Sequence, residues 1–173
     1  MRVIGGEFRS RRIKSLAGME MRPTPDKLRE TLFNILGAEV VESTFLDAYA
    51  GTGSVGIEAL SRGAARVVFL EKHKGAVALI RENLESLGAL GRALIIAGPA
   101  LRELGKHRAD IVFLDPPYPL EKEYAPALEL IGEMRPRLVI AQHSVRFDPG
   151  EQHGVLVRYR VVRQGDNALS FYR

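Results

Sequence analysis

Hydrophobic and polar residues alternate between two patterns from residue 44 onward. Short apolar runs predict buried strands, and longer stretches with an apolar residue every three or four positions predict amphipathic helices. The predicted strands are residues 44–47, 66–71, 93–97, 111–115 and 138–141. The predicted helices are residues 54–62, 74–87, 100–104 and 123–131. This alternation predicts a parallel sheet covered by helices on both faces.

The C-terminal pattern is different. Two strand-like runs, 155–163 and 168–172, are separated only by the turn sequence Gln164-Gly165-Asp166-Asn167. No helix fits between them, so we expect an antiparallel hairpin at the sheet edge. The predicted fold class is therefore α/β, with a mostly parallel, Rossmann-like, seven-stranded sheet that ends in this hairpin.

The N-terminal segment has no place in this alternation. We expect residues 1–21 to form a small basic β-hairpin or extended arm, attached to one compact domain over residues 22–173. The first helix of that domain is predicted to have Thr24 as its N-cap and Pro25 at its first position, and to stop at Gly37.

The composition of the 173 residues narrows the function classes. The chain has no cysteine, which excludes disulfides, thiolate metal sites and a cysteine nucleophile. Its four histidines are scattered, so we expect no metal site. No apolar run approaches the roughly 20 residues of a membrane span, and the start lacks the pattern of a secretory signal. We therefore expect a cytoplasmic, monomeric protein of one domain.

The positive charge is concentrated at the N-terminus. The chain has a net charge of +4, and residues 1–30 contain eight basic and four acidic residues, an excess that accounts for all of it. Guanidinium and ammonium groups suit phosphate recognition, although an ordinary solubilising surface is the alternative. The candidate RNA-binding residues are Arg9, Arg11, Arg12, Lys14, Arg22, Lys27 and Arg29.

A glycine-rich sequence lies between the first predicted strand and the helix that follows it. Gly51, Gly53 and Gly56 form G-x-G-x-x-G, which permits a tight turn and close approach of a ligand to the backbone. Glu71 ends the next strand, where a carboxylate can accept both ribose hydroxyls. These residues predict a cofactor that contains adenosine.

Asp47 favours S-adenosylmethionine over NAD as that cofactor. A carboxylate at the end of the first strand attracts the cationic methionine portion, whereas it would repel a pyrophosphate. Tyr49, in the same loop, is a further candidate cofactor contact. The loop is not a phosphate-binding P-loop, because no G-K-[ST] follows it.

The tetrapeptide Asp115-Pro116-Pro117-Tyr118 follows the fourth predicted strand. Strand ends in an open α/β sheet share one crevice, so it should face the glycine loop. The Asp115 side chain and the Pro116 carbonyl can accept the two N–H bonds of an exocyclic amine and aim its nitrogen at the sulfonium methyl. Tyr118 can stack on an extruded base. Asp115, Pro116 and Tyr118 are the candidate catalytic residues, with Asp115 also near the cofactor.

With these motifs, the chain resembles the bacterial 16S ribosomal RNA guanine-N2 methyltransferases of the RsmD type. The resemblance covers nearly the full length and is carried by Arg2-Val3-Ile4-Gly5-Gly6, Arg22-Pro23-Thr24, residues 26–34, the loop 47–56, residues 58–63, Asp115-Pro116-Pro117-Tyr118, Gly165 and Phe171-Tyr172. It implies a class I S-adenosylmethionine-dependent fold. It also implies methylation of one guanine in small-subunit ribosomal RNA, within an assembly intermediate that contains ribosomal proteins.

The sequence departs from the usual methyltransferase pattern at two positions. Gln142 stands near the end of the fifth predicted strand, where an acidic residue is expected in many relatives. Residues 97–100 lack the carboxylate that often lies near adenine, so backbone groups and Ala100 are the expected contacts there. Adenine-N6 methylation of DNA or RNA, and a non-catalytic RNA-binding assembly factor, remain alternatives.

Overall fold

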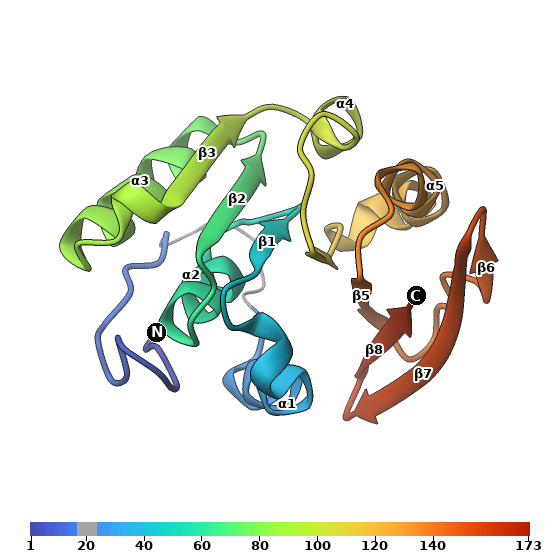
Figure 1. Ribbon diagram of the computed structural model, residues 1–173, viewed down its shortest axis with the longest axis horizontal. Helices are drawn as coiled ribbons and strands as arrows, with labels where there is room; N and C mark the ends of the chain where they lie inside the picture. The colour runs from blue at the N-terminus through green and yellow to red at the C-terminus, as the bar shows by residue number, and fades with distance from the viewer. Residues whose placement is uncertain (17–23) are drawn as a thin grey trace.

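The computed structural model describes residues 1–16 and 24–173. Its centre is an eight-stranded sheet with strand order β3-β2-β1-β4-β5-β8-β7-β6 (Figure 1). The strands are β1 (Thr44–Asp47), β2 (Arg66–Glu71), β3 (Ala93–Ala97), β4 (Ile111–Leu114), β5 (Leu138–Ser144), β6 (Gln152–His153), β7 (Leu156–Gln164) and β8 (Asn167–Tyr172). The seven predicted strands are confirmed. The two-residue β6, which pairs with the start of β7, is too short for a periodicity to reveal.

Helices cover both faces of the sheet. The α-helices are α1 (Asp26–Leu36), α2 (Ser54–Ser61), α3 (Lys74–Ser86), α4 (Ala100–Glu103) and α5 (Tyr124–Met134). The 3-10 helices are η1 (Gly37–Val40), η2 (Leu90–Arg92) and η3 (Tyr118–Glu123). Helices α1, α2 and α3 pack into one core, and α4 and α5 pack into another on the opposite face. Among the described residues, no helix combines the length and the apolar character needed to cross a membrane.

Strands β1 to β5 are parallel, and the C-terminal hairpin is antiparallel, as predicted. All residues of β4 are buried, which is why its sequence is continuously apolar rather than alternating. The strand order reverses between β1 and β4, and the crevice of an open α/β sheet lies at such a reversal.

The start of α1 differs from the prediction. Helix α1 begins at Asp26, and Pro25 takes the N-cap position without a capping side-chain hydrogen bond. The prediction of Thr24 as the N-cap is therefore wrong. The Thr24 side chain lies instead near the Asp115 carboxyl group, on the loop after β4, and lowers the pKa of that group. Gly37 ends α1 as predicted, with φ of 49° and its N–H bonded to the Phe33 carbonyl.

Residues 1–16 fold back on themselves and pack against α2 and α3. A single antiparallel bridge joins Arg2 to Arg12. Both carboxylate oxygens of Glu58, in α2, accept backbone N–H groups, from Ile4 and Gly5 at 2.9 Å each. Apolar side chains of the segment, Val3, Phe8 and Ile13, belong to the core on this face. The segment is thus attached to the helix that follows the glycine loop.

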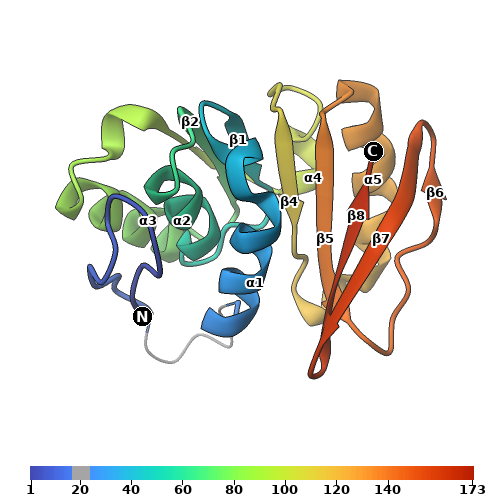
Figure 2. The same cartoon turned by 60° about the horizontal axis from the view of Figure 1, so that its bottom comes forward.

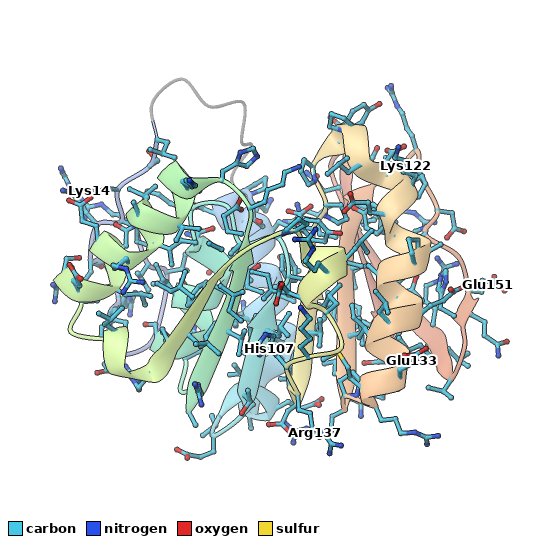
Figure 3. All side chains as sticks on the ribbon, turned by 90° about the horizontal axis from the view of Figure 1, so that it is seen from above. Lys14, His107, Lys122, Glu133, Arg137 and Glu151 are labelled. Atoms are coloured by element: carbon cyan, nitrogen blue, oxygen red, sulfur yellow. The ribbon has the colours of Figure 1, made fainter. Side chains whose placement is uncertain are left out.

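The carboxyl ends of the parallel strands lie together at one end of the sheet, which is the lower end in Figure 2. The start of α1 and the turn between β7 and β8 lie at the same end. In Figure 3, Lys14 and Lys122 lie toward one edge of the molecule and Arg137 lies at the other. The N-terminal segment and η3 therefore flank the crevice edge.

Candidate active site

The glycine loop connects β1 to α2 through two residues in the left-handed region. Gly51 has φ of 55° and Gly53 has φ of 78°, and residues that carry a Cβ rarely adopt these values. Gly56 is required for another reason, because a Cβ there would lie 2.2 Å from the Phe69 ring in β2. The glycines therefore turn the chain sharply and let α2 approach the sheet closely.

Two buried carboxyl groups support this loop. Asp47 is 1% exposed, and its Oδ2 accepts the Gly56 N–H at 3.0 Å. Glu71 is 7% exposed; its Oε2 accepts the Gly51 N–H at 2.8 Å, and its Oε1 accepts the His73 N–H at 2.8 Å. Burial raises the pKa of Asp47 to about 7, and the charge of Glu71 adds to this, while the Gly56 N–H opposes it.

Asp115 belongs to the same electrostatic group. Protein atoms surround its carboxyl, although part of its surface reaches solvent. Burial raises its pKa to about 8, the charge of Asp47 raises the pKa further, and the nearby Thr24 side chain lowers it. Register supports this proximity, since Asp47 pairs with Phe113, two residues before Asp115.

The charge of this group selects the kind of ligand it can hold. Within residues 1–16 and 24–173, no basic side chain forms a salt bridge with Asp47, Glu71 or Asp115. A buried carboxyl group is accommodated either by protonation, which the raised pKa values of Asp47 and Asp115 favour, or by a compensating positive charge from a ligand. These three carboxyl groups therefore fit a cationic ligand, such as the ammonium and sulfonium groups of S-adenosylmethionine, and they disfavour a pyrophosphate. The described residues contain no cluster of three potential metal ligands.

The remaining predicted contacts lie around this crevice. The Tyr49 hydroxyl donates a 2.6 Å hydrogen bond to Glu123 Oε2, which ties the glycine loop to η3. Ala100 is buried at the first position of α4. Pro116 is buried, whereas Tyr118 is 80% exposed at the start of η3. The Tyr118 ring is thus free to meet a flat partner.

Comparisons with known proteins agree with this geometry. The family model described as "Conserved hypothetical protein 95" matches residues 1–173. YlbH of Bacillus subtilis, provisionally named an rRNA methyltransferase, is 34% identical over 182 residues, covering 100% of this chain and 98% of YlbH. Ribosomal RNA small subunit methyltransferase D (RsmD) of Escherichia coli is 38% identical over 120 residues, covering 68% of this chain and 60% of that protein. The chain belongs to the RsmD/YlbH family.

One solved structure resembles this chain over nearly its whole length. YhhF of Escherichia coli, provisionally described as a methyltransferase, superposes with a TM-score of 0.85 at 29% identity. The superposition covers 99% of this chain and 96% of that one. The two proteins therefore share the mostly parallel sheet with antiparallel C-terminal strands.

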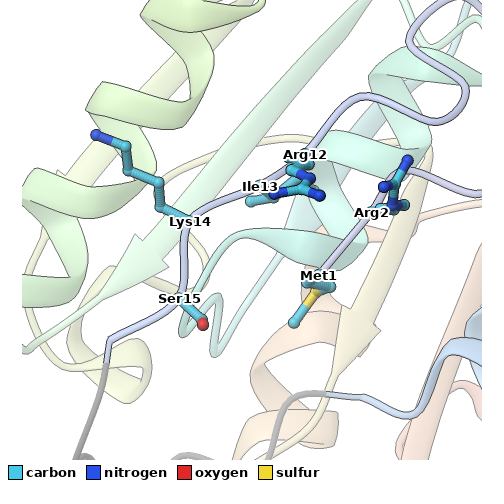
Figure 4. A pocket seen from close by; sticks show the side chains of 6 residues that line it. All are labelled: Met1, Arg2, Arg12, Ile13, Lys14 and Ser15. Carbon is cyan, nitrogen blue, oxygen red and sulfur yellow. The ribbon is translucent and has the colours of Figure 1, made fainter.

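The predicted RNA-binding residues of this chain differ in their exposure to solvent. The exposed ones are Arg9, Arg11, Arg12, Lys14 and Lys27. Arg12 and Lys14, with Arg2, line a pocket of about 430 Å³ (Figure 4). Arg29 is fully buried, so its prediction as an RNA ligand is wrong; its guanidinium bonds to the Arg2 carbonyl at 2.7 Å and pairs with Asp26 and Glu58. Arg22 lies outside the described residues.

Sequence reasoning missed a second basic group, on the other side of the crevice. Arg146, Arg158 and Arg163 line a pocket of about 140 Å³ together with His143 and Phe147. The first arginine follows β5 and the other two lie on β7, so only the hairpin pairing brings them together. The run of arginines in residues 158–163 was the available signal. Thr24 was missed as an Asp115 partner because its role depends on where α1 docks.

Proposed function

We propose that this protein transfers the methyl group of S-adenosylmethionine to the exocyclic N2 amine of a guanine in small-subunit (16S) ribosomal RNA. The observation that carries the proposal is the cluster of three carboxyl groups in the crevice, those of buried Asp47 and Glu71 and of partly exposed Asp115, with the exposed Tyr118 ring on the loop after Asp115. The printed names of two relatives, YlbH and RsmD, support the ribosomal RNA class of substrate.

The cofactor fits the glycine loop and the carboxyl groups beneath it. S-adenosylmethionine supplies an electrophilic methyl group when bound. Glu71 accepts the ribose hydroxyls, and Asp47 faces the cationic methionine portion. Gly51, Gly53 and Gly56 let the backbone approach the ligand closely. Tyr49 and Ala100 would complete the wall of this site.

Asp115, Pro116 and Tyr118 position the amine. The Asp115 carboxylate and the Pro116 carbonyl accept its two N–H bonds, and Tyr118 stacks on the extruded base. Catalysis then comes largely from proximity and orientation. A pKa of about 8 also makes the Asp115 carboxylate a competent acceptor for the proton that the amine loses as it gains the methyl group.

Basic residues would hold the RNA on both sides of the crevice. Arg9, Arg11, Arg12, Lys14 and Lys27 lie on the N-terminal side, and Arg146 and Arg163 lie on the hairpin side. A surface of this size contacts phosphates and a local RNA shape rather than a long sequence. An assembly intermediate of the small subunit, with ribosomal proteins bound, is the substrate that we propose.

The decisive experiment is methyl transfer from labelled cofactor to small-subunit ribosomal RNA and particles from cells that lack this protein. Digestion to nucleosides should yield labelled N2-methylguanosine. Labelled N6-methyladenosine would replace the proposal with adenine methylation. Cofactor binding without transfer to RNA, particles, DNA or protein would favour a non-catalytic assembly factor.

A further inference from the structure

Strand β5 brings Gln142 beside Asp115. Strands β4 and β5 are parallel, and Leu114 pairs with Ala141, so the residues that follow them are neighbours. The Tyr124 hydroxyl donates to the Gln142 carbonyl, and the charge of Asp115 contributes to the raised pKa of the same tyrosine, after burial. Both observations place residue 142 at the candidate active site.

The side chains of Gln142 and Asp115 also share a face of the sheet. Leu114 and Ala141 belong to the core on the α5 side. Because side chains alternate along a strand, Gln142 on β5 turns to the α1 side, and continuation of the same alternation beyond the end of β4 turns Asp115 to that side as well. Phe113 and Ile140, one residue before those two, are in the α1-side core, as this alternation requires.

The amide of Gln142 is buried and incompletely bonded. The residue is 6% exposed, and Oε1 is fully buried without a hydrogen-bond donor among residues 1–16 and 24–173. Buried polar side-chain atoms in folded proteins nearly always have a partner, so each exception calls for an explanation. Here the exception lies one strand away from the residue that receives the amine.

We propose that Gln142 Oε1 accepts the N1–H of the target guanine and so determines which base is methylated. This inference rests on the proposed function. Guanine presents three adjacent donors, two at N2 and one at N1–H, and Asp115, Pro116 and Gln142 supply three acceptors. Adenine presents an unprotonated N1 beside its amine, and this lone pair would face the Gln142 oxygen. A site built around a substrate donor rejects analogues that lack it.

The test replaces the methylated guanine with 2-aminopurine in a ribosomal RNA fragment. This base keeps the N2 amine but has an unprotonated N1. We expect the wild-type protein to prefer guanine by about 100-fold in kcat/KM. Gln142→Met retains the size of the side chain without the acceptor, and it should lower the preference to within about 10-fold, mainly through slower guanine methylation.

Gln164→Met is the matched control. Gln164 Oε1 is also buried without a partner among the described residues, but it lies on β7, two strands from β5. The control should retain the wild-type preference, and both variants should match the wild type in thermal unfolding and cofactor binding. N2-methylguanosine formation with an unchanged preference in Gln142→Met overturns the role of Gln142 alone. Failure of the wild type to form N2-methylguanosine removes the proposed function and this inference with it.

Discussion

The Thr24 side chain lies close to the Asp115 carboxyl group and lowers its pKa, which links the residues before α1 to the loop after β4. The Thr24 hydroxyl thus favours the ionised carboxylate and partly opposes the burial that raises the pKa of Asp115 to about 8. Only the ionised carboxylate can take up the proton that the amine loses. The position of α1 thereby influences the fraction of the protein in which Asp115 is ionised at neutral pH.

Loss of the Thr24 hydroxyl should shift the pH dependence of turnover. In Thr24→Val the pKa of Asp115 rises further, so we expect kcat/KM at pH 7 to fall about 3- to 10-fold and to recover at higher pH. The pH profile of methyl transfer measures this. Thr24→Ser, which keeps the hydroxyl, should retain the wild-type profile; a loss in Thr24→Val that is equal at every pH would exclude the mechanism.

Replacement of Asp115 should separate turnover from cofactor binding. In Asp115→Asn the side chain keeps its shape but loses the negative charge, so we expect kcat to fall by about 10³-fold or more. Calorimetric titration should show that cofactor affinity falls far less than turnover, because Asp47 and Glu71 remain in the site. Asp166→Asn, in the exposed β7–β8 turn, is the control and should be fully active. Near-normal turnover of Asp115→Asn would remove the assigned role.

Cofactor binding should be linked to protons. The pKa values of Asp47 and Asp115 are raised, so their contribution to stability is present below about pH 4 and is lost as pH rises through about 7 to 8. A cationic ligand favours the ionised forms. We therefore expect affinity to increase from pH 6 to 9, with release of protons that calorimetry in buffers of different ionisation enthalpy detects. Asp47→Asn should reduce this release; unchanged proton release would contradict the assignment.

The exposed N-terminal arginines should contribute to RNA affinity. We expect replacement of Arg9, Arg11 and Arg12 by alanine to weaken RNA binding about 10- to 100-fold at low salt and to reduce its salt dependence. The control replaces Arg66, the first residue of β2, and Arg137, the residue before β5; both are exposed and lie away from the carboxyl ends of the strands. Equal effects of the two sets would indicate non-specific charge, and the prediction would then be wrong.

Arg29 should matter for stability rather than for RNA. Removal of its guanidinium leaves the buried Glu58 carboxylate with less positive charge beside it. We therefore expect Arg29→Met to lower the free energy of unfolding by about 3 kcal/mol. Denaturant titration measures the change. The folded fraction should bind RNA with wild-type affinity. Arg29→Met combined with Glu58→Gln should recover part of the loss.

The sequence was sufficient for most of the fold because its signals are local. Buried parallel strands such as residues 111–114 are continuously apolar, and G-x-G-x-x-G fixes both a turn and a close approach. The errors arose where long-range packing decides the outcome. Arg29 looks like any surface cation in the sequence, but in the structure its guanidinium bonds to the Arg2 carbonyl of the N-terminal segment and pairs with Glu58 of α2.

Long-range packing also limited what the sequence could predict about the candidate site. The motifs identified Asp47, Glu71 and Asp115 because each stands at a strand end, where the topology of the fold determines its position. Thr24 and Gln142 could not be assigned in this way. Their surroundings depend on the docking of α1 and on the register of β5 with β4, neither of which a motif encodes.

The attachment of the N-terminal segment to α2 has a geometric consequence. Gly53 precedes this helix at the cofactor loop, while Glu58 and Ser61 near its other end hold Ile4, Gly5 and Phe8. Eight helical residues span about 12 Å. The helix therefore sets a fixed separation between the glycine loop and the N-terminal segment, and in the proposed function the same separation lies between the methyl donor and the basic residues of that segment.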